Sequence, residues 1–492
     1  MLGALIDSHS LSPAPILEAV ERYRGRIIDL DSSRSLSADA FARARQSLRA
    51  SLRTNDLSPG DRVLLAVANG PAFIAALAAV LECEASPLLV HFRTPPAELQ
   101  RYAERFGARF VLGEAELEPG LASIARSTIP VPLGDFSQLC WASLHSPDPS
   151  TVDHESLRGV PLHPTSGSTG SPKMALRPGF AAVEEARHYV ETLAIDADDL
   201  IAAIPPMSHA YGFGMCAMVP LVSGASIVST SRFSARWIHR ALAEFPVTVL
   251  PLAPAMLDML SFGAGVDLRS VRWTLTAGAT LPRGAAERFR AKTGTVPCPL
   301  YGTTETGGIS VATRADGQDV DGRVGPPMAG VSIEVRQQGT MPGLGPDVGK
   351  LFVRSSSMMH GYLQDDRRVT VPRDGWFETG DLARITSDGT IQLRGRDSEV
   401  VNVSGMKVAP CEVEEAIASL VGVREVKVYA GAVGTSDQIV KAAIVAERDL
   451  TAADVRRHCE QHLVYYKRPH VVTLLEALPR SATGKIIRAQ LP

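Results

Sequence analysis

The sequence lacks paired cysteines and any pattern typical of a zinc site. Its six cysteines are scattered, with no C-x-x-C pair and no histidine cluster at metal-ligand spacing. A disulfide framework is therefore not expected, and reduced thiols in a cytoplasmic protein fit the pattern. The cysteines are Cys83, Cys140, Cys216, Cys298, Cys411 and Cys459.

Long apolar runs are also absent. Residues 1–13 contain no basic segment followed by an apolar stretch, which argues against a secretion signal. The most apolar stretch, residues 73–90, is interrupted by Glu82, Glu84 and Pro87, so we do not expect it to span a membrane. These absences predict a cytoplasmic protein with no membrane partner.

The chain has no strong excess of charge of either sign. Its 50 basic and 53 acidic residues give a net charge of −3, so no nucleic-acid partner is predicted. Lysine is scarce: only 8 of the 50 basic residues are lysines, and three of these, Lys173, Lys407 and Lys485, lie in the motifs below. Because an ammonium group differs physically from a guanidinium, we expect these positions to need lysine itself.

The length and the order of expected elements indicate several domains. A chain of 492 residues exceeds what one hydrophobic core normally supports. Strands alternate with helices in short units, which predicts a parallel sheet covered on both faces. The expected strands are 63–67, 88–90, 110–112, 200–204, 226–229, 247–250 and 273–276, and the expected helices are 71–81 and 96–106.

The pattern of residues along the sequence changes after Gly322. Short runs rich in β-branched residues at 331–335, 350–354 and 391–393 predict an antiparallel, barrel-like subdomain. Beyond residue 400, helices at 410–420 and 452–462 and strands at 425–430, 441–447 and 471–474 predict a compact α+β unit. We therefore expect an α/β protein with a large N-terminal domain, residues 1–396, and a small C-terminal domain, residues 397–492.

A loop rich in glycine and hydroxyl groups follows the strand expected at 159–163. Its two glycines let the backbone approach a ligand closely, its hydroxyls are donors, and its lysine supplies a positive charge. Because Pro172 precedes the lysine and the Gly-Lys-[Ser/Thr] ending is missing, this is not a Walker loop. It predicts a site for polyphosphate oxygens, with a flexible Ser/Gly turn as the alternative. The loop residues are Thr165, Ser166, Gly167, Ser168, Thr169, Gly170 and Lys173.

This loop resembles the phosphate loop of the adenylate-forming superfamily, which includes acyl- and aryl-CoA ligases, beetle luciferases and peptide-synthetase adenylation domains. The resemblance covers roughly residues 40–490 and is strongest to acyl-CoA synthetases. An ordered set of blocks is far more specific than any single motif. The further matching blocks are 205–215 (PPMSHAYGFGM), 276–282 (TAGATLP), 301–308 (YGTTETGG), Gly325-Pro326, 375–382 (GWFETGDL), 393–412 (LRGRDSEVVNVSGMKVAPCE) and 479–488 (PRSATGKIIR).

The resemblance implies a site for ATP and Mg²⁺. Glu305 would be the magnesium ligand and Thr304 would contact the α-phosphate, a pairing that suits a metal bridging phosphates. Tyr301 and Gly302 would lie against the adenine. The nucleotide site would also include Thr303, Gly278 and Ala279.

Three charged residues carry further implied roles. Asp381 resembles the aspartate that accepts hydrogen bonds from both ribose hydroxyls, joined there by Arg396. An ion pair between these two is compatible with that role. Lys485 would bridge the substrate carboxylate and the α-phosphate, where two anions must approach during adenylation. It should matter little for thioester formation.

The block at 205–215 would lie near the bound acid. His209 would be an aromatic group beside the carboxylate, with a core histidine as the alternative. No carboxylate is present at positions 209–211 to pair an α-amino group, so an α-amino acid substrate is disfavoured. Small residues leave volume for a bulky apolar or aromatic acid, although they also serve close packing. The expected lining is His209, Tyr211, Gly212, Ala253, Pro254, Ala277, Gly278, Ala279, Gly302, Thr303 and Gly308.

The hinge departs from the pattern of the superfamily. The pivot is usually Asp or Lys, and here that position is Ser398, between Asp397 and Glu399. Rotation needs only a residue that can absorb a dihedral change, so a mobile C-terminal lid is still expected. After rotation, Ser404, Gly405 and Met406 would line a tunnel for the pantetheine of coenzyme A.

The resulting hypothesis is an acyl-CoA ligase that converts an acid and ATP to acyl-AMP and pyrophosphate, then transfers the acyl group to CoA. Loading of a carrier-protein thiol is the close alternative, because both thiols are pantetheine. A luciferase-like oxygenase and a non-catalytic nucleotide-binding scaffold are further alternatives. The frequent arginine and alanine fit a GC-rich genome, and the enzyme could serve either degradation or natural-product assembly. A homodimer is a further open alternative.

Overall fold

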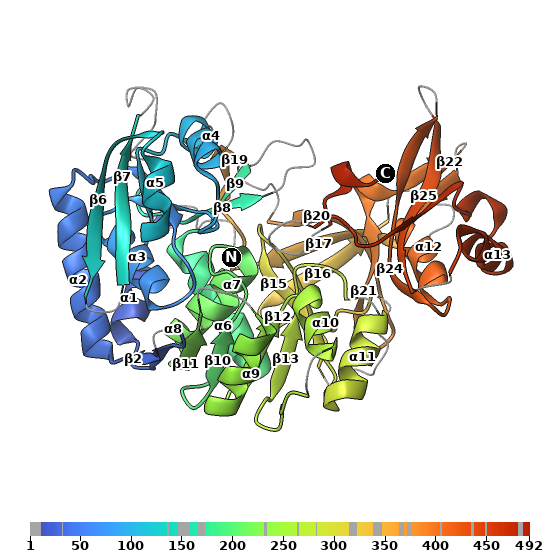
Figure 1. Cartoon of the computed structure of the whole chain (residues 1–492), viewed down its shortest axis with the longest axis horizontal. Helices are drawn as coiled ribbons and strands as arrows, with labels where there is room; N and C mark the ends of the chain where they lie inside the picture. The colour runs from blue at the N-terminus through green and yellow to red at the C-terminus, as the bar shows by residue number, and fades with distance from the viewer. Residues whose placement is uncertain are drawn as a thin grey trace.

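The computed structural model describes most of the chain and divides it into a large N-terminal part and a small C-terminal part (Figure 1). Among the described residues, every helix is too short or too polar to cross a membrane. The described ranges are 11–31, 33–134, 137–145, 157–165, 173–230, 234–262, 265–281, 283–313, 322–337, 347–363, 369–370, 375–403, 406–433, 437–447, 450–480 and 486–492.

The first sheet has nine strands in the order β19-β18-β9-β8-β4-β3-β5-β7-β6. Its centre is parallel, and antiparallel strands flank it on both sides. The parallel strands predicted in this region are confirmed, whereas the hairpin of β6 and β7 was not predicted. The strands are β3 (Arg62–Ala66), β4 (Ser86–Leu89), β5 (Phe110–Glu114), β6 (Ala125–Leu133), β7 (Ser137–Leu144), β8 (Leu162–Thr165), β9 (Lys173–Leu176), β18 (Gly361–Leu363) and β19 (Val369–Thr370).

The second sheet has eight strands in the order β15-β14-β13-β12-β10-β11-β1-β2. Six neighbouring strands, from β14 to β1, run parallel, and an antiparallel strand closes each edge. The N-terminal strand β1 pairs with β11, about 200 residues later in the chain. The strands are β1 (Ile27–Asp29), β2 (Arg34–Leu36), β10 (Leu200–Ala203), β11 (Ser226–Ser229), β12 (Val249–Leu252), β13 (Trp273–Thr276), β14 (Cys298–Thr303) and β15 (Gly307–Val311).

Helix α3 (Pro71–Glu82) lies in the centre of the large part. Its residues 71–81 are all buried, as expected for a helix that is apolar on every side. Proline at its first position and Gly70 before it, at φ +132°, fix where the helix begins. The other helices of the large part are α1 (Ala14–Arg22), α2 (Ala38–Thr54), α4 (Pro96–Phe106), η2 (Ala115–Leu117), α5 (Glu118–Leu121), α6 (Gly179–Leu193), α7 (Ala210–Gly212), η4 (Phe213–Met218), α8 (Val219–Ser223), α9 (Ala235–Glu244), α10 (Pro254–Phe262) and α11 (Arg283–Thr293).

A four-stranded antiparallel sheet follows in the order β16-β17-β20-β21, so the prediction of antiparallel strands after residue 322 is confirmed. In this hydrogen-bonded order β16 and β21 are the two edges. The strands are β16 (Val331–Arg336), β17 (Gly349–Ser355), β20 (Phe377–Ile385) and β21 (Ile391–Arg396).

The small C-terminal part has its own core and sheet, as predicted for an α+β unit. Strands β24, β25 and β26 form one sheet, and α12 and α13 pack beside it (Figure 1). The division at residues 396 and 397 stays a prediction. The elements are η5 (Asp397–Glu399), β22 (Val401–Val403), β23 (Met406–Val408), α12 (Pro410–Ala418), β24 (Val423–Val433), β25 (Asp437–Ala446), α13 (Ala452–His462), η6 (Tyr465–Lys467), β26 (Val471–Leu475) and η7 (Arg488–Gln490).

Candidate functional site

Most of the described residues predicted for the site gather at one edge of the eight-stranded sheet. Strands β10, β12, β13 and β14 are neighbours and run parallel, so their carboxyl ends meet at the same edge. Crevices outside such carboxyl ends are the usual ligand sites of open α/β sheets. The predicted residues just beyond these ends are His209 and Tyr211 after β10, Ala253 and Pro254 after β12, Ala277, Gly278 and Ala279 after β13, and Thr304 and Glu305 after β14.

Asp381 and Arg396, the predicted ribose contacts, are register partners on β20 and β21. The carboxylate of Asp381 lies 3.0 Å from Nε of Arg396 and accepts a hydrogen bond from the Tyr301 hydroxyl at 2.6 Å. Asp381 is 6% exposed. This contact joins the predicted adenine residue Tyr301 to the predicted ribose pair, across two different sheets.

Burial dominates the electrostatics of this cluster. Desolvation raises the pKa of Asp381 above its usual value, although Arg396 and the Tyr301 hydroxyl each lower it. Burial and the negative charge of Asp381 also raise the pKa of Tyr301 well above 10, so its phenol stays a donor. An aspartate that is desolvated but still paired is a strong acceptor for a hydroxyl group.

Glu305, the predicted magnesium ligand, is half-buried in the turn between β14 and β15. Its Oε1 accepts a hydrogen bond from the Tyr362 hydroxyl at 2.6 Å, and its backbone oxygen accepts one from Met359 N at 2.7 Å. Its Oε2 takes no hydrogen bond from any residue within the described ranges, so one carboxylate oxygen remains for a cation. A single carboxylate beside phosphate oxygens is a normal environment for Mg²⁺.

Lys173 also lies near Tyr362. Its Nζ is 5.2 Å from the centre of the Tyr362 ring, so the predicted phosphate lysine and the predicted magnesium ligand share one aromatic neighbour. The sequence analysis missed Tyr362; its position in the short strand β18, between Gly361 and Leu363, offered only a weak signal.

Two glycines of the site are required by close contacts with neighbouring atoms. A Cβ at Gly302 would lie 2.4 Å from the Gly307 carbonyl oxygen, and one at Gly308 would lie 2.5 Å from the Tyr189 hydroxyl. Packing therefore accounts for these two glycines, and their role in lining an acyl pocket stays a prediction. In contrast, a Cβ at Gly278 would meet nothing within 4 Å, so this glycine faces open space.

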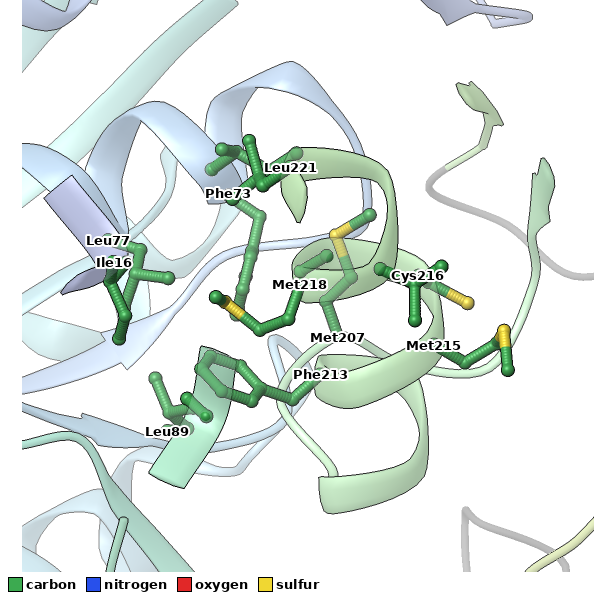
Figure 2. Close-up of a cluster of buried hydrophobic side chains, with 14 of the residues drawn as sticks. Ile16, Phe73, Leu77, Leu89, Met207, Phe213, Met215, Cys216, Met218 and Leu221 are labelled. Carbon is green, nitrogen blue, oxygen red and sulfur yellow. The ribbon is translucent and has the colours of Figure 1, made fainter. Parts of the chain in front are cut away.

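The segment that carries His209 is tied to the large core. His209 is the N-cap of α7, and the chain continues through the π-helix η4 into α8. Figure 2 shows Phe213 and Met218 of this segment among Phe73, Leu77 and Leu89. π-helical turns occur often at functional sites, and here one follows directly on the predicted acid-binding histidine.

Asn69 holds the start of the same segment and was also missed by the sequence analysis. Its amide nitrogen donates to the carbonyl oxygens of Ala203 and Pro205 at 3.0 and 2.9 Å. Its amide oxygen accepts from Met207 N at 2.7 Å. One half-buried amide thus fixes the backbone between β10 and His209.

The hydroxyl of Tyr211 is buried, although part of the residue is exposed. Burial raises the pKa of Tyr211 well above 10, with smaller effects from Cys216 and Tyr189. The phenol is therefore neutral at physiological pH and can serve as a hydrogen-bond donor. Tyr211 would therefore present an uncharged polar group to the predicted acid pocket.

Some predicted residues lie outside the described part of the chain, namely Ser166, Gly167, Ser168, Thr169, Gly170, Ser404, Gly405 and Lys485. The residues that bound the phosphate loop are described: Thr165 and Lys173 are register partners on β8 and β9. Likewise Arg480 and Ile486, on either side of the Lys485 segment, form an isolated bridge.

Charged contacts join the two parts of the chain at the predicted hinge. Ser398 lies in η5, between Asp397, whose carboxylate is 3.0 Å from Lys350 Nζ, and Glu399. Glu399 forms ion pairs with Lys427 and with Arg488, which follows Lys485 by three residues. Glu399 also raises the pKa of Asp381 slightly through its charge. The tail that carries Lys485 is therefore attached close to the predicted ribose pair.

Two family models and several known proteins match this chain. Residues 16–363 match the family model described as AMP-binding enzyme, and residues 412–485 match the AMP-binding enzyme C-terminal domain. The chain is 29% identical over 486 residues to the sulfoacetate–CoA ligase of Cupriavidus necator, covering 94% of each protein. It is also 29% identical over 498 residues to the anthranilate–CoA ligase of Pseudomonas aeruginosa, covering 96% of this chain and 93% of that protein.

Among solved structures, ATP-bound MatB from Rhodopseudomonas palustris superposes with a TM-score of 0.81 at 22% identity, covering 96% of this chain and 97% of that one. This likeness concerns the fold, and it extends over both the large and the small part of the chain.

Proposed function

This chain belongs to the AMP-binding enzyme family and is an ATP-dependent acid–thiol ligase, and we propose that it activates an apolar or aromatic carboxylic acid as its acyl-AMP and transfers the acyl group to coenzyme A. The observation that carries the proposal is the convergence of Asp381, Tyr301 and Glu305 around one sheet edge, with Lys173 joined to Glu305 through Tyr362. A scaffold protein would need none of these groups together.

In the first half-reaction, an oxygen of the substrate carboxylate attacks the α-phosphorus of ATP, the bond to the β-phosphate breaks, and pyrophosphate leaves. Asp381 and Arg396 hold the ribose, and Thr304 contacts the α-phosphate. Lys173 and Lys485 offset the negative charge of the phosphates and of the incoming carboxylate. Fixing both reactants at one place supplies much of the rate enhancement, because it replaces a bimolecular encounter.

Glu305 and the phosphate oxygens of ATP would hold Mg²⁺, which neutralises charge on the departing pyrophosphate when it is bound. Glu305 Oε2, which takes no hydrogen bond from the described part of the chain, supports this assignment, and Tyr362 orients the carboxylate through Oε1. Within the described ranges no cluster of three or more His, Cys, Asp or Glu could hold a metal alone. Glu305 therefore suits a metal ion that is held jointly by this carboxylate and by the phosphates of ATP.

In the second half-reaction, the thiol sulfur of CoA attacks the acyl carbon, the bond to AMP breaks, and the thiol proton is released. We propose that Ser398 is the pivot for the change between the two steps. The ion pair of Lys350 with Asp397 and those of Arg394 with Glu412 and Glu415 cross from the large part to the small part and support a defined position of the lid. Ser404, Gly405 and Met406 would then face the pantetheine. A carrier-protein thiol remains the alternative acceptor.

The choice of acid follows from the residues near His209. Tyr211 is desolvated, Ala210 is apolar, and Ala253 and Ala277 are small. A charged α-amino group would remain unpaired among them. An aromatic acid fits this environment better, and the relative from Pseudomonas aeruginosa is named for an aromatic acid.

The test is release of pyrophosphate from ATP across a panel of aryl, fatty and polycyclic acids, with and without CoA. We expect release with at least one aryl or apolar acid, followed by formation of its CoA thioester. Activation without use of CoA would favour loading of a carrier protein. Failure with every acid, together with no binding of ATP, would refute the proposal.

A further inference from the structure

A buried ion pair lies directly behind the loop that carries Glu305. Arg177, which follows β9, and Glu185 in α6 are each about 1% exposed, and Arg177 Nη2 is 2.8 Å from Glu185 Oε2. Burying two charges is costly, and an apolar pair of similar volume often serves stability equally well. The presence of this pair therefore calls for a reason other than stability.

Both partners contact the backbone of the loop, one on each side of Glu305. Arg177 Nη1 donates to the carbonyl oxygen of Thr304 at 3.1 Å. Gly308 N donates to Glu185 Oε1 at 3.2 Å. The ion pair thus fixes the loop at both ends of the turn that presents Thr304 and Glu305.

Two glycines allow Glu185 to reach this position. A Cβ at Gly307 would lie 2.6 Å from the Glu185 carboxyl carbon, and one at Gly214 would lie 2.6 Å from its Oε1. Gly307 also has φ +74°, a conformation that favours glycine. Gly214 belongs to the π-helix that follows His209. The Glu185 carboxylate is therefore packed between the Glu305 loop and the His209 segment.

Arg177 extends the connection to the phosphate loop. It directly follows β9, the strand that begins at Lys173. The same ion pair consequently links the strand of Lys173, the turn of Thr304 and Glu305, and the segment of His209. These three segments carry the groups assigned to the nucleotide phosphates and to the acid.

We propose that Arg177 and Glu185 are positioning residues for adenylation, which hold Thr304 and Glu305 in register with Lys173 and His209; this inference rests on the function proposed above for Glu305. Neither residue touches the substrate. A displacement of about 1 Å in reacting groups can cost on the order of 100-fold in rate, so a rigid, buried charge pair has a clear use at this place.

The test compares binding of ATP with Mg²⁺ and binding of adenosine alone, each by calorimetry, at a temperature where thermal unfolding shows that every variant is folded. Adenosine reports on Tyr301 and Asp381, whereas ATP with Mg²⁺ also needs the positioned loop. The variants are Arg177→Met, Arg177→Lys and Glu185→Gln. Glu185→Gln keeps an acceptor for Gly308 N, so it carries the test if Arg177→Met does not fold.

A matched control exists elsewhere in the core. Arg45 in α2 and Glu82 in α3 form a largely buried arginine–glutamate pair, with Arg45 Nη1 3.2 Å from Glu82 Oε1 and side chains 9% and 11% exposed, and Glu82 also lies 3.8 Å from Arg49 Nε. Arg45→Met removes a charge from a pair of the same chemistry that has no contact with the site loop. It should leave both affinities within about twofold of the wild type.

We expect Arg177→Met and Glu185→Gln to weaken binding of ATP with Mg²⁺ about 10- to 100-fold and adenosine less than about twofold, with partial recovery in Arg177→Lys. Wild-type affinity in both variants, or an equal loss for adenosine and ATP, would overturn the positioning role while leaving the proposed function intact. A wild-type protein that binds neither ligand would overturn both.

Discussion

The hydroxyl of Tyr362 donates to Oε1 of Glu305 at 2.6 Å, while the Tyr362 ring faces the ammonium of Lys173. Burial and the Glu305 carboxylate raise the pKa of this tyrosine far above 10, so it stays protonated and remains the donor. The contact fixes one oxygen of Glu305, while the other takes no hydrogen bond from the described residues.

Replacing Tyr362 should therefore impair use of the metal more than binding of the nucleoside. Tyr362→Phe removes a hydrogen bond to a charged group, an interaction of about 1.5–3 kcal/mol. We expect a roughly tenfold rise in the Mg²⁺ concentration needed for half-maximal pyrophosphate release. A magnesium titration of wild type and variant measures this, and an unchanged midpoint would contradict the role given to Tyr362.

As the pH is lowered, adenosine binding should weaken at a higher pH than it would if Asp381 had the usual pKa of an aspartate. Burial raises the pKa of Asp381 above 3.8 despite Arg396, and only the carboxylate accepts from both ribose hydroxyls. Adenosine affinity is therefore highest at pH values above the raised pKa of Asp381, and it decreases as the pH falls through that value. By the same linkage, this group stabilises the fold below pH 3.8, and that contribution is lost as the pH rises through the raised value.

The measurement is adenosine affinity from about pH 4 to 7 for the wild type and Asp381→Asn. Subtracting the variant removes the titration of adenine itself. A pH profile that is the same in both proteins would show that Asp381 does not hold the ribose.

Lys485 should separate the two half-reactions. Lys485→Ala removes the charge that lies between two approaching anions, so acyl-AMP formation should fall about 100- to 1,000-fold. Thioester formation from supplied acyl-AMP and CoA should change little, because no such approach of anions occurs there. Both steps are followed by chromatography of the products. Equal losses in the two steps would exclude the assigned role.

A side chain at Gly308 should destabilise the fold. Gly308→Ala would place a methyl group 2.5 Å from the Tyr189 hydroxyl, and such overpacking typically costs about 1–3 kcal/mol. Combining it with Tyr189→Leu removes both the hydroxyl and the ring carbon Cζ, which would lie 2.5 and 2.6 Å from that methyl group, and should recover part of the loss. Thermal unfolding of the two single variants and the double variant measures the coupling. Simple additivity would mean that the two side chains do not meet.

The elements with strong local signals were predictable from the sequence. Helix α4 matches its predicted bounds, because Pro96 begins it and Gly107, at φ +65°, ends it. Strands β11 and β13 also match, since short β-branched runs lie between polar turns. The ordered motifs also predict Tyr301, Glu305 and Asp381 as site residues, and the roles assigned to these three stay predictions.

Residues whose role depends on distant contacts were not predictable. In the sequence, Arg177 and Glu185 look like ordinary charged residues, one at the end of a strand and one in a helix. Only the fold places both behind the loop that carries Thr304. Asn69 is a loop residue whose partners lie about 135 residues away. The strand β1 has three residues, too few for a periodic pattern, and its partner β11 is about 200 residues distant.

This last pairing constrains how the chain can assemble during synthesis. Ile27–Asp29 leave the ribosome about 200 residues before their hydrogen-bonding partner, which ends at Ser229. At about 5–20 residues per second, the nascent segment waits on the order of 10 to 40 s for that partner. Until then the apolar residues of this segment lack their partner strand. Slow translation, or a stall before Ser229, would therefore lengthen the time during which the nascent chain can aggregate and needs chaperones.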